Sequence, residues 1–151
     1  MKLVLCDVGG NTYGIDIAKV QGIEKKMEMV AVPNASDLVE GIINLRGFVT
    51  PIISLHKKFH VEEQADHSEQ QYIITRMHDM MVGFRVDAVA EIVEVEEADI
   101  LPVPVLVTNE DTAYIDSLIQ QNGKLVLVLD IECILNEAER KRIAKLVEDE
   151  K

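Results

Sequence analysis

The chain has 151 residues with a formal net charge of −12, and 48% of its residues are hydrophobic while 28% are charged. This composition is typical of one soluble globular domain and argues against intrinsic disorder. The negative charge disfavours DNA, RNA and anionic membranes as partners, because these polyanions repel an acidic protein. No apolar run reaches the roughly 20 residues of a membrane span, and the first one is too short for a signal peptide, so we expect a cytoplasmic protein.

Short β-like runs separated by turn residues dominate the first half of the chain. An apolar run at residues 3–8 is followed by Gly-Gly-Asn, which predicts a hairpin turn. Residues 13–17 alternate apolar side chains with glycine and aspartate, as a half-buried strand does. A further strand at residues 48–55 contains Pro51. Because proline donates no hydrogen bond to a neighbouring strand, we expect this strand to be bulged or to lie at a sheet edge.

The second half is organised in the same way. Residues 61–71 are polar and aperiodic, which predicts a loop that divides the chain near its middle. Beyond it, residues 72–76, 81–87 and 88–95 are β-like, and an Asn-Gly hairpin signal precedes an apolar strand at 125–129. Helical periodicity occurs only near the C-terminus. Strands in two groups without βαβ alternation predict two small antiparallel barrels or a sandwich.

Residues that could carry chemistry are few. His56 and His60 have the i, i+4 spacing by which two histidines on a helix share a metal ion. No glutamate follows His56 as in a metalloprotease motif, so we favour solvated histidines and keep a metal-dependent hydrolase as the alternative. Cys6 and Cys133 each lie in an apolar run, which favours two buried, reduced thiols. We therefore predict no catalytic residue, no metal and no cofactor.

One segment has the character of a binding site. Residues 41–47 read Gly-Ile-Ile-Asn-Leu-Arg-Gly, so a lone arginine, Arg46, lies in an apolar stretch bounded by glycines. It can be a structural arginine paired with an acid, or an arginine held at a partner surface. The two interpretations do not exclude each other. We expect the guanidinium at the rim of a cleft between the two groups of strands.

This segment and several others resemble the CheW family. The matching blocks keep the order and spacing of the family from about residue 3 to about residue 136. They are Tyr13-Gly-Ile-Asp-Ile17 with Val20, Gln21 and Ile23; Val32-Pro-Asn34; residues 41–47; Pro51-Ile-Ile53; Val82-Gly-Phe-Arg-Val-Asp-Ala-Val89; and Leu125 to Ile131.

The resemblance implies an all-β fold, with two small five-stranded SH3-like barrels and a C-terminal helix. On this basis the chain is one CheW-like domain with approximate lobes at 12–65 and 72–130. Residues 1–11 and 125–136 are available to close either lobe, and residues 131–150 form the helix.

The resemblance also implies a non-enzymatic adaptor with two partners. One is the cytoplasmic tip of a chemoreceptor (a methyl-accepting chemotaxis protein), held near the groove between the lobes. The other is the homologous regulatory domain of the histidine kinase CheA, contacted edge to edge. Such an adaptor is cytoplasmic and is recruited to membrane-associated receptor arrays. The receptor-side candidates are Val20, Gly41, Arg46 and Gly47, and the kinase-side candidates are Phe84 and Val86.

The chain departs from the family pattern in a few places. Family members commonly have a glutamate at the position of Gly22, and it pairs with the arginine that matches Arg46. Here Glu24 or Glu40 takes its place, or Arg46 is free. Ser54 and His56 also occupy positions where the family commonly has Asp and Arg. The same motifs fit a CheW-like scaffold of a receptor–kinase pathway other than motility, which we keep as the alternative function.

Overall fold

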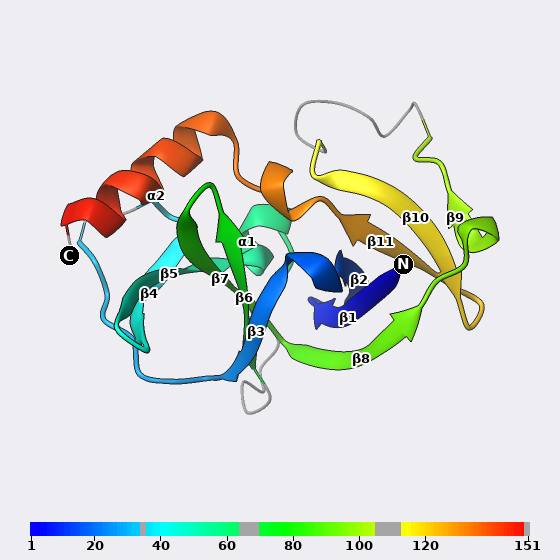
Figure 1. Cartoon of the computed structure of the whole chain (residues 1–151), viewed down its shortest axis with the longest axis horizontal. Helices are drawn as coiled ribbons and strands as arrows, with labels where there is room; N and C mark the ends of the chain where they lie inside the picture. The colour runs from blue at the N-terminus through cyan, green and yellow to red at the C-terminus, as the bar shows by residue number, and fades with distance from the viewer. Residues whose placement is uncertain (34–35, 64–69, 105–112, 150–151) are drawn as a thin grey trace.

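The computed structural model describes residues 1–33, 36–63, 70–104 and 113–149. In this part of the chain, strands form two sheets in two lobes, and a helix near the C-terminus lies along one of the lobes (Figure 1). The predicted all-β class with a C-terminal helix is therefore confirmed. Most of the predicted loop at 61–71 lies outside the described residues.

The middle of the chain forms one lobe, which we call the central lobe. Its five-stranded sheet has the order β3-β6-β7-β5-β4. All neighbours in it are antiparallel except β5 and β7, which run parallel. The strands are β3 (Val20–Lys25), β4 (Val39–Leu45), β5 (Phe48–Ser54), β6 (Gln71–Met77) and β7 (Met80–Val86). A short helix, α1 (Leu55–Phe59), follows β5 directly.

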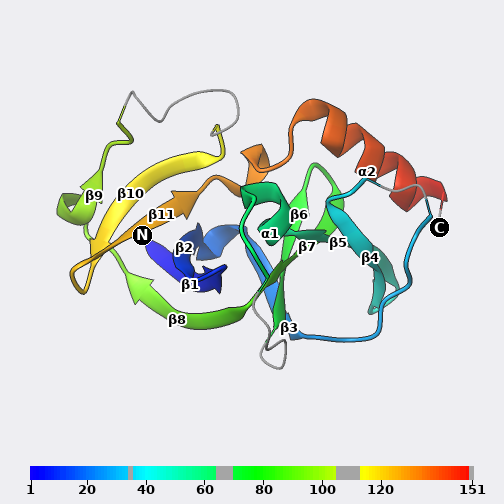
Figure 2. The ribbon, with the colours of Figure 1, turned by 180° about the vertical axis from the view of Figure 1, so that it is seen from behind.

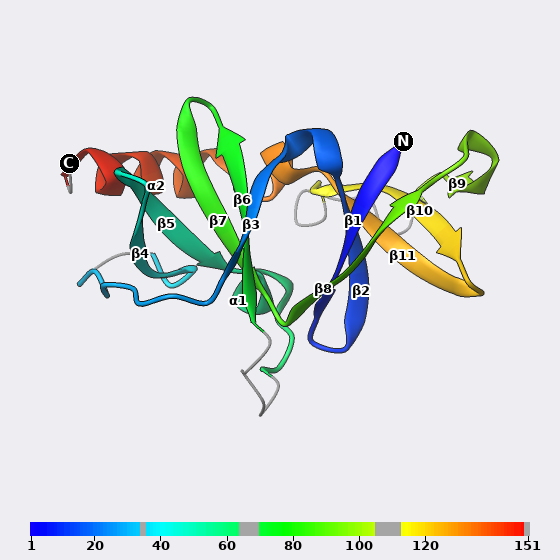
Figure 3. The ribbon, with the colours of Figure 1, turned by 60° about the horizontal axis from the view of Figure 1, so that its bottom comes forward.

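The first and last strands of the chain form the second lobe, which we call the terminal lobe. Its sheet has the order β8-β1-β2-β11-β10-β9, in which β2 and β11 pair in parallel (Figure 3). The strands are β1 (Lys2–Val8), β2 (Asn11–Asp16), β8 (Ala88–Glu94), β9 (Ile100–Leu101), β10 (Ile115–Gln121) and β11 (Lys124–Leu129). The parallel pair closes this lobe between segments more than 100 residues apart in the chain.

The two sheets divide the chain differently from the predicted lobes at 12–65 and 72–130. β2 belongs to the terminal lobe, and β6 and β7 belong to the central lobe. The difference arises at the two parallel pairings, β2 with β11 and β5 with β7. Neither pairing follows a hairpin turn, so no local signal in the sequence indicates it.

The C-terminal helix begins later than the predicted residue 131. Residues Ile131–Cys133 form a 3₁₀ turn instead, and the Asp130 side chain caps this turn by accepting a hydrogen bond from the Glu132 backbone N–H at 3.1 Å. The α-helix α2 spans Glu137–Asp149 and is capped by Asn136, whose side-chain oxygen accepts from the Glu139 N–H at 2.8 Å. The Glu139 carboxylate accepts from the Asn136 N–H in return, which completes a capping box. Cys133 is exposed here, so the prediction that it is buried was wrong.

Pro51 lies inside the central sheet, because β5 is flanked by β7 and β4. Of the two predicted alternatives, the edge strand was therefore wrong, whereas a register shift does lie beside Pro51, where Val39 and Gly41 of β4 pair with Ile53 and Ile52. Pro51 is opposite Ile42, whose backbone N–H and C=O both bond to Val30 on the far side of β4. The parallel pairing with β7 begins only at Ile52. The position thus requires no hydrogen bond from residue 51, and proline is tolerated.

One apolar core extends through both lobes. It contains Val4, Cys6 and Tyr13 from the terminal lobe together with Ile53 and Phe84 from the central lobe. Residues of α2, such as Ile143, pack against the same core. The two lobes therefore bury a common interface. α1 lies beside this interface (Figure 2).

Candidate partner-binding surfaces

Arg46, the lone arginine of the apolar segment at residues 41–47, lies in the turn between β4 and β5. Arg46 and Gly47 both have positive φ angles, 51° and 88°, as a two-residue hairpin turn of type I′ requires. The Asn44 side chain accepts a hydrogen bond from the Gly47 N–H at 2.8 Å and fixes the turn. The Arg46 side chain is 75% exposed. The local sequence Asn-Leu-Arg-Gly thus builds a rigid turn that holds one guanidinium out in solvent.

Arg46 is paired with Glu24 on β3, at 2.9 Å between Nη2 and Oε1. Of the two acids expected near Arg46, Glu24 is therefore the one that pairs with it. Glu40, the other candidate, is engaged by Arg85 instead. Because Arg46 is mostly in solvent, such a pair contributes at most about 1 kcal/mol to stability.

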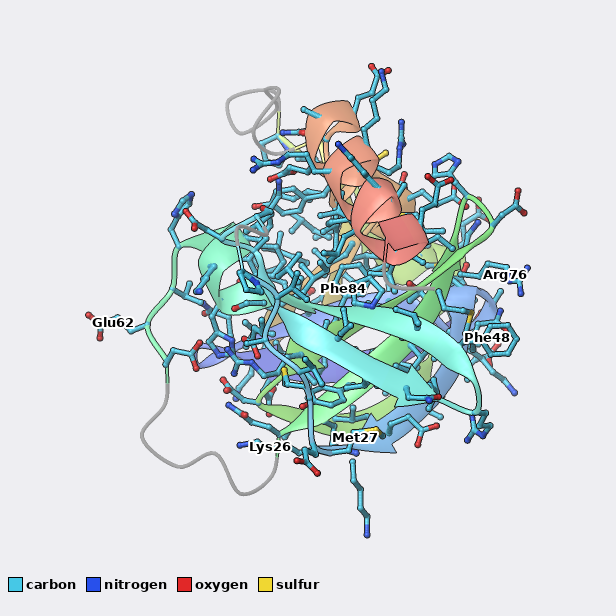
Figure 4. The ribbon with its side chains drawn as sticks, turned by 90° about the vertical axis from the view of Figure 1, so that its left-hand side faces the viewer. Lys26, Met27, Phe48, Glu62, Arg76 and Phe84 are labelled. Carbon is cyan, nitrogen blue, oxygen red and sulfur yellow. The ribbon has the colours of Figure 1, made fainter. Side chains whose placement is uncertain are left out.

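The turn does not lie at a cleft between the lobes, so that expectation was wrong. Gly47 and Phe48 line a hollow with Val147 and Glu148 near the C-terminal end of α2. This end of the central lobe faces away from the terminal lobe (Figure 1). Figure 4 views it directly and shows Phe48 projecting outward beside Arg76.

The other two receptor-side candidates are less exposed. Val20 is half-buried at the beginning of β3, opposite Thr75 of β6. Gly41 is buried on β4, and a Cβ atom there would lie 2.8 Å from the Val30 carbonyl oxygen and 2.9 Å from Met29 Sδ. Gly41 therefore permits the segment before β4 to pack closely on this strand. The four candidates share one lobe and its two edge strands, but only Arg46 and Gly47 are exposed on one turn.

Phe84 and Val86 lie in the shared core, and both are 0% exposed. Figure 4 shows Phe84 inside the central lobe. The expectation that they occupy an exposed lobe edge was wrong. β7 lies between β6 and β5, and nearly all of its residues are buried. A strand covered on both faces has a nearly continuous apolar sequence, and Met-Met-Val-Gly-Phe-Arg-Val fits this pattern.

His56 and His60 do not converge on a common site. His56 is 1% exposed, so the prediction that it is solvated was wrong, and its Nε2 lies 2.9 Å from Asp87 Oδ1. His60 is exposed and ends α1 in the left-handed conformation, with φ 57°. Among the described residues, no group of three or more His, Cys, Asp or Glu could hold a metal ion. The geometry therefore gives no support to a shared metal.

A buried arginine forms a polar cluster that the sequence did not indicate. Arg85 is 4% exposed and donates hydrogen bonds to Glu40, Glu63 and Ser54. Burial alone would lower the pKa of Arg85, but the hydrogen bonds and charges of Glu63 and Glu40 outweigh burial and raise it. The cluster ties β7 to β4 and to the segment after α1. Its role is in the architecture of the central lobe, because its cation is enclosed.

Hollows that are open to solvent include one on each lobe. The Phe48 hollow, of about 580 Å³, lies on the central lobe, and Phe48 itself is 57% exposed. The Leu125 hollow, of about 560 Å³, lies on the terminal lobe, and Leu125 is 62% exposed. Apolar lining residues of the first are Phe48, Val49, Met80, Met81, Ala144 and Val147. The lining of the second is mixed: the apolar residues Leu5, Ala90, Leu125 and Val126 lie beside Asn11, Thr12, Glu91, Gln121, Asn122 and Lys124. Exposed large apolar side chains surrounded by polar residues are typical of protein–protein contacts.

Within the residues that the structure describes, no helix is both long enough and apolar enough to cross a membrane.

Comparison with known proteins gives a consistent result. The CheW-like domain matches residues 2–139. The chain is 34% identical to the chemotaxis protein CheW of Treponema pallidum over 149 residues, which covers 96% of this chain and 88% of that protein. It is 31% identical to the chemotaxis protein CheW of Bacillus subtilis, over 90% of this chain and 87% of that protein.

A solved structure extends this similarity to three dimensions. The scaffolding protein TtCheW from Thermoanaerobacter tengcongensis superposes with a TM-score of 0.83 at 29% sequence identity. The match covers 91% of this chain and 89% of that one. Both lobes are thus included in the similarity. The chain belongs to the family of CheW-like domains.

Proposed function

We propose that this chain is a non-enzymatic adaptor that couples the cytoplasmic tips of chemoreceptors to the histidine kinase CheA in chemotaxis signalling arrays. The observation that carries the proposal is the family match over residues 2–139, which includes both lobes. The chain itself stays in the cytoplasm and reaches the membrane-associated array through the receptor. The similarity to a protein described as a scaffold supports a role in binding.

The receptor tip binds the central lobe at the turn that holds Arg46 and Gly47. A guanidinium that is 75% exposed and fixed on a rigid turn suits a carboxylate on a helical partner. Val20, on the edge strand β3, adds apolar contact. Gly41 acts beneath this surface, since it permits the segment at Met29 and Val30 to pack on β4.

The kinase regulatory domain binds the Leu125 hollow of the terminal lobe. An adaptor that holds two partners at once needs two surfaces that do not overlap. The Phe48 hollow includes Gly47, so it is adjacent to the receptor surface. The Leu125 hollow lies on the other lobe and exposes a large apolar side chain. Phe84 and Val86 contribute only indirectly, through the core that supports β7.

A purified receptor-tip fragment and the regulatory domain of CheA test this proposal. The wild-type chain should bind each fragment alone and should assemble both into one ternary complex on size-exclusion chromatography. Leu125→Asp should weaken kinase binding by about tenfold or more, as loss of an interface hot spot does, and should leave receptor binding intact. Ile92→Asp is the matched control, because Ile92 is 55% exposed on the same lobe but does not line the hollow.

Two results would contradict the proposal. A wild-type chain that binds neither fragment would exclude the adaptor function. Equal kinase affinity for the wild type and Leu125→Asp would place the kinase contact elsewhere. A scaffold of a receptor–kinase pathway other than motility would use the same two kinds of contact, and the receptors that co-purify from the native cell would distinguish it.

A further inference from the structure

The short helix α1 contacts the terminal lobe although it belongs to the central lobe. It follows β5 without a loop, and the Ser54 side chain caps it by accepting from the Lys57 N–H at 3.2 Å. Leu55 and His56 are buried. In the views of Figure 2 and Figure 3, α1 lies between the two lobes. Its side chains therefore reach elements that lie far from it in the sequence.

The first of these contacts centres on Asp87, the residue at which the chain crosses from β7 to β8. Asp87 Oδ1 lies 2.9 Å from His56 Nε2, and Asp87 Oδ2 accepts a hydrogen bond from the Gly9 N–H at 2.8 Å. The Asp87 N–H donates to the Asp7 carbonyl at 2.8 Å. One carboxylate thus connects a helix of the central lobe with the β1–β2 turn of the terminal lobe.

The His56–Asp87 contact is enclosed and depends on close approach. Neither ring nitrogen of His56 forms a hydrogen bond of good geometry with the described residues, and neither does Asp87 Oδ1. The facing atoms of the two side chains are buried, so the contact depends on the close approach of α1 to Asp87. The β1–β2 turn also packs closely against the segment that follows α1. A Cβ atom on Gly9 would lie only 2.6 Å from Val61 Cγ2.

The second contact is aromatic. The Phe59 ring stacks on Tyr13 of β2 with centroids 4.7 Å apart, and on Tyr114 with centroids 5.2 Å apart. Tyr114 directly precedes β10, so both tyrosines belong to the terminal lobe. The ring of a central-lobe helix is therefore placed between two rings of the other lobe. Lys58 adds an ion pair to Glu139 of α2 at 2.9 Å.

We infer that α1 locks the two lobes at one fixed angle, with His56 and Phe59 as its two positioning residues. The polar contact of His56 lies near the beginning of this short helix, and the aromatic contact of Phe59 lies at its end. Together they oppose rotation of one lobe relative to the other. The consequence for signalling rests on the proposed function. The receptor and kinase surfaces lie on different lobes, so the lobe angle fixes the relative orientation of the two partners.

Distance measurements between spin labels test the lock in the full chain. In a Cys133→Ser background, which removes the exposed thiol, Lys25→Cys and Gln120→Cys place one label on each lobe. Lys25→Cys with Arg76→Cys places both labels on the central lobe. His56→Leu and Phe59→Ala should each broaden the interlobe distance distribution and shift its mean, while the distribution within the central lobe stays unchanged.

Thr75→Val is the matched control. It removes a buried hydrogen bond, from the Thr75 hydroxyl to the Val82 carbonyl at 3.1 Å, entirely within the central lobe. This variant should keep the narrow interlobe distribution. Phe59→Leu provides a milder variant if Phe59→Ala fails to fold, and it should broaden the interlobe distribution to a smaller extent.

Different results would contradict the interlobe lock and the adaptor function. Unchanged interlobe distances in both α1 variants would overturn the lock, and so would equal broadening within and between lobes, because α1 would then only support the fold. The adaptor function fails separately, if the wild-type chain with a narrow interlobe distribution binds neither the receptor tip nor the kinase domain.

Discussion

Arg46 and Glu24 join the two opposite edges of the central-lobe sheet. Glu24 lies on the edge strand β3, and Arg46 follows the other edge strand, β4, with 2.9 Å between their charged atoms. An ion pair across the two edges means that the sheet curls until its edges approach each other, as in a small barrel. The pair is therefore both a weak closure of the barrel and the exposed feature of the proposed receptor surface.

Replacement of Arg46 should separate these two roles. Arg46→Ala should lower the free energy of unfolding by at most about 1 kcal/mol, because the ion pair is largely solvated. Receptor-tip affinity should fall about tenfold, the equivalent of ~1.4 kcal/mol, since the guanidinium makes a direct contact. Titrations with the receptor tip and with the kinase domain, beside a urea melt, measure all three quantities.

Arg142→Ala is the control for this experiment, because Arg142 is exposed on α2 and has no part in the proposed surfaces. It should change neither affinity. A large loss of stability in Arg46→Ala, with both affinities falling together, would show that Arg46 is a structural residue.

Much of the fold could be predicted from local sequence. Asn122 and Gly123 have φ angles of 52° and 77°, so the Asn-Gly signal correctly indicated a hairpin. Glu24 was one of two acids expected near Arg46. The division into lobes could not be predicted, because the parallel pairs of β2 with β11 and β5 with β7 depend on contacts distant in sequence.

The candidate site residues, too, could be predicted only in part from local sequence. Arg46 was recognisable, since a charged residue in an apolar stretch bounded by glycines has few interpretations. Phe84 was misplaced because an apolar run can lie in a core or at an edge, and only burial distinguishes the two. Leu125 was part of an apolar strand, and its 62% exposure depends on which face of β11 the terminal lobe leaves open.

Gly41 should be sensitive to the smallest substitution. In Gly41→Ala the new methyl group would meet the Val30 carbonyl oxygen at 2.8 Å, so backbone must move. We expect a loss of about 1–3 kcal/mol in the free energy of unfolding, as overpacking costs. Gly22→Ala is the matched control, because its Cβ would have only Glu24 Oε1 nearby, at 3.8 Å. Similar urea midpoints for the two variants would refute the packing role of Gly41.

The two cysteines should differ strongly in reactivity. Burial, with a smaller contribution from Asp7, raises the pKa of Cys6 to about 12, so this thiol should not react in the folded chain. Cys133 is exposed, but its hydrogen bond to Asp130, with a smaller contribution from slight burial, raises its pKa above the ordinary 9.0. Alkylation should therefore modify Cys133 alone, with a rate that still increases as the pH rises past 9.0, because the thiolate is the reactive form.

Asp130→Asn tests the cause of this shift. Asparagine can still cap the 3₁₀ turn at Glu132, but it lacks the negative charge that disfavours the Cys133 thiolate. The pKa of Cys133 should fall, and its alkylation at neutral pH should become faster than in the wild type. An unchanged rate, measured by mass spectrometry over time, would show that Asp130 does not control this thiol.

Phe84 and Leu125 should respond in opposite ways to the same kind of truncation. Phe84 is 0% exposed and packs in the core shared by both lobes, so Phe84→Ala should lower the free energy of unfolding by about 3–5 kcal/mol. Leu125 is 62% exposed, and Leu125→Ala should change stability by less than about 0.5 kcal/mol.

The effects on kinase affinity should be the opposite of those on stability. The folded fraction of Phe84→Ala should bind the kinase domain with nearly wild-type affinity, whereas Leu125→Ala should bind it more weakly. Titrations at low temperature, where Phe84→Ala remains folded by circular dichroism, make the comparison. If folded Phe84→Ala loses kinase affinity while Leu125→Ala keeps it, the kinase contact depends on β7 and not on the Leu125 hollow.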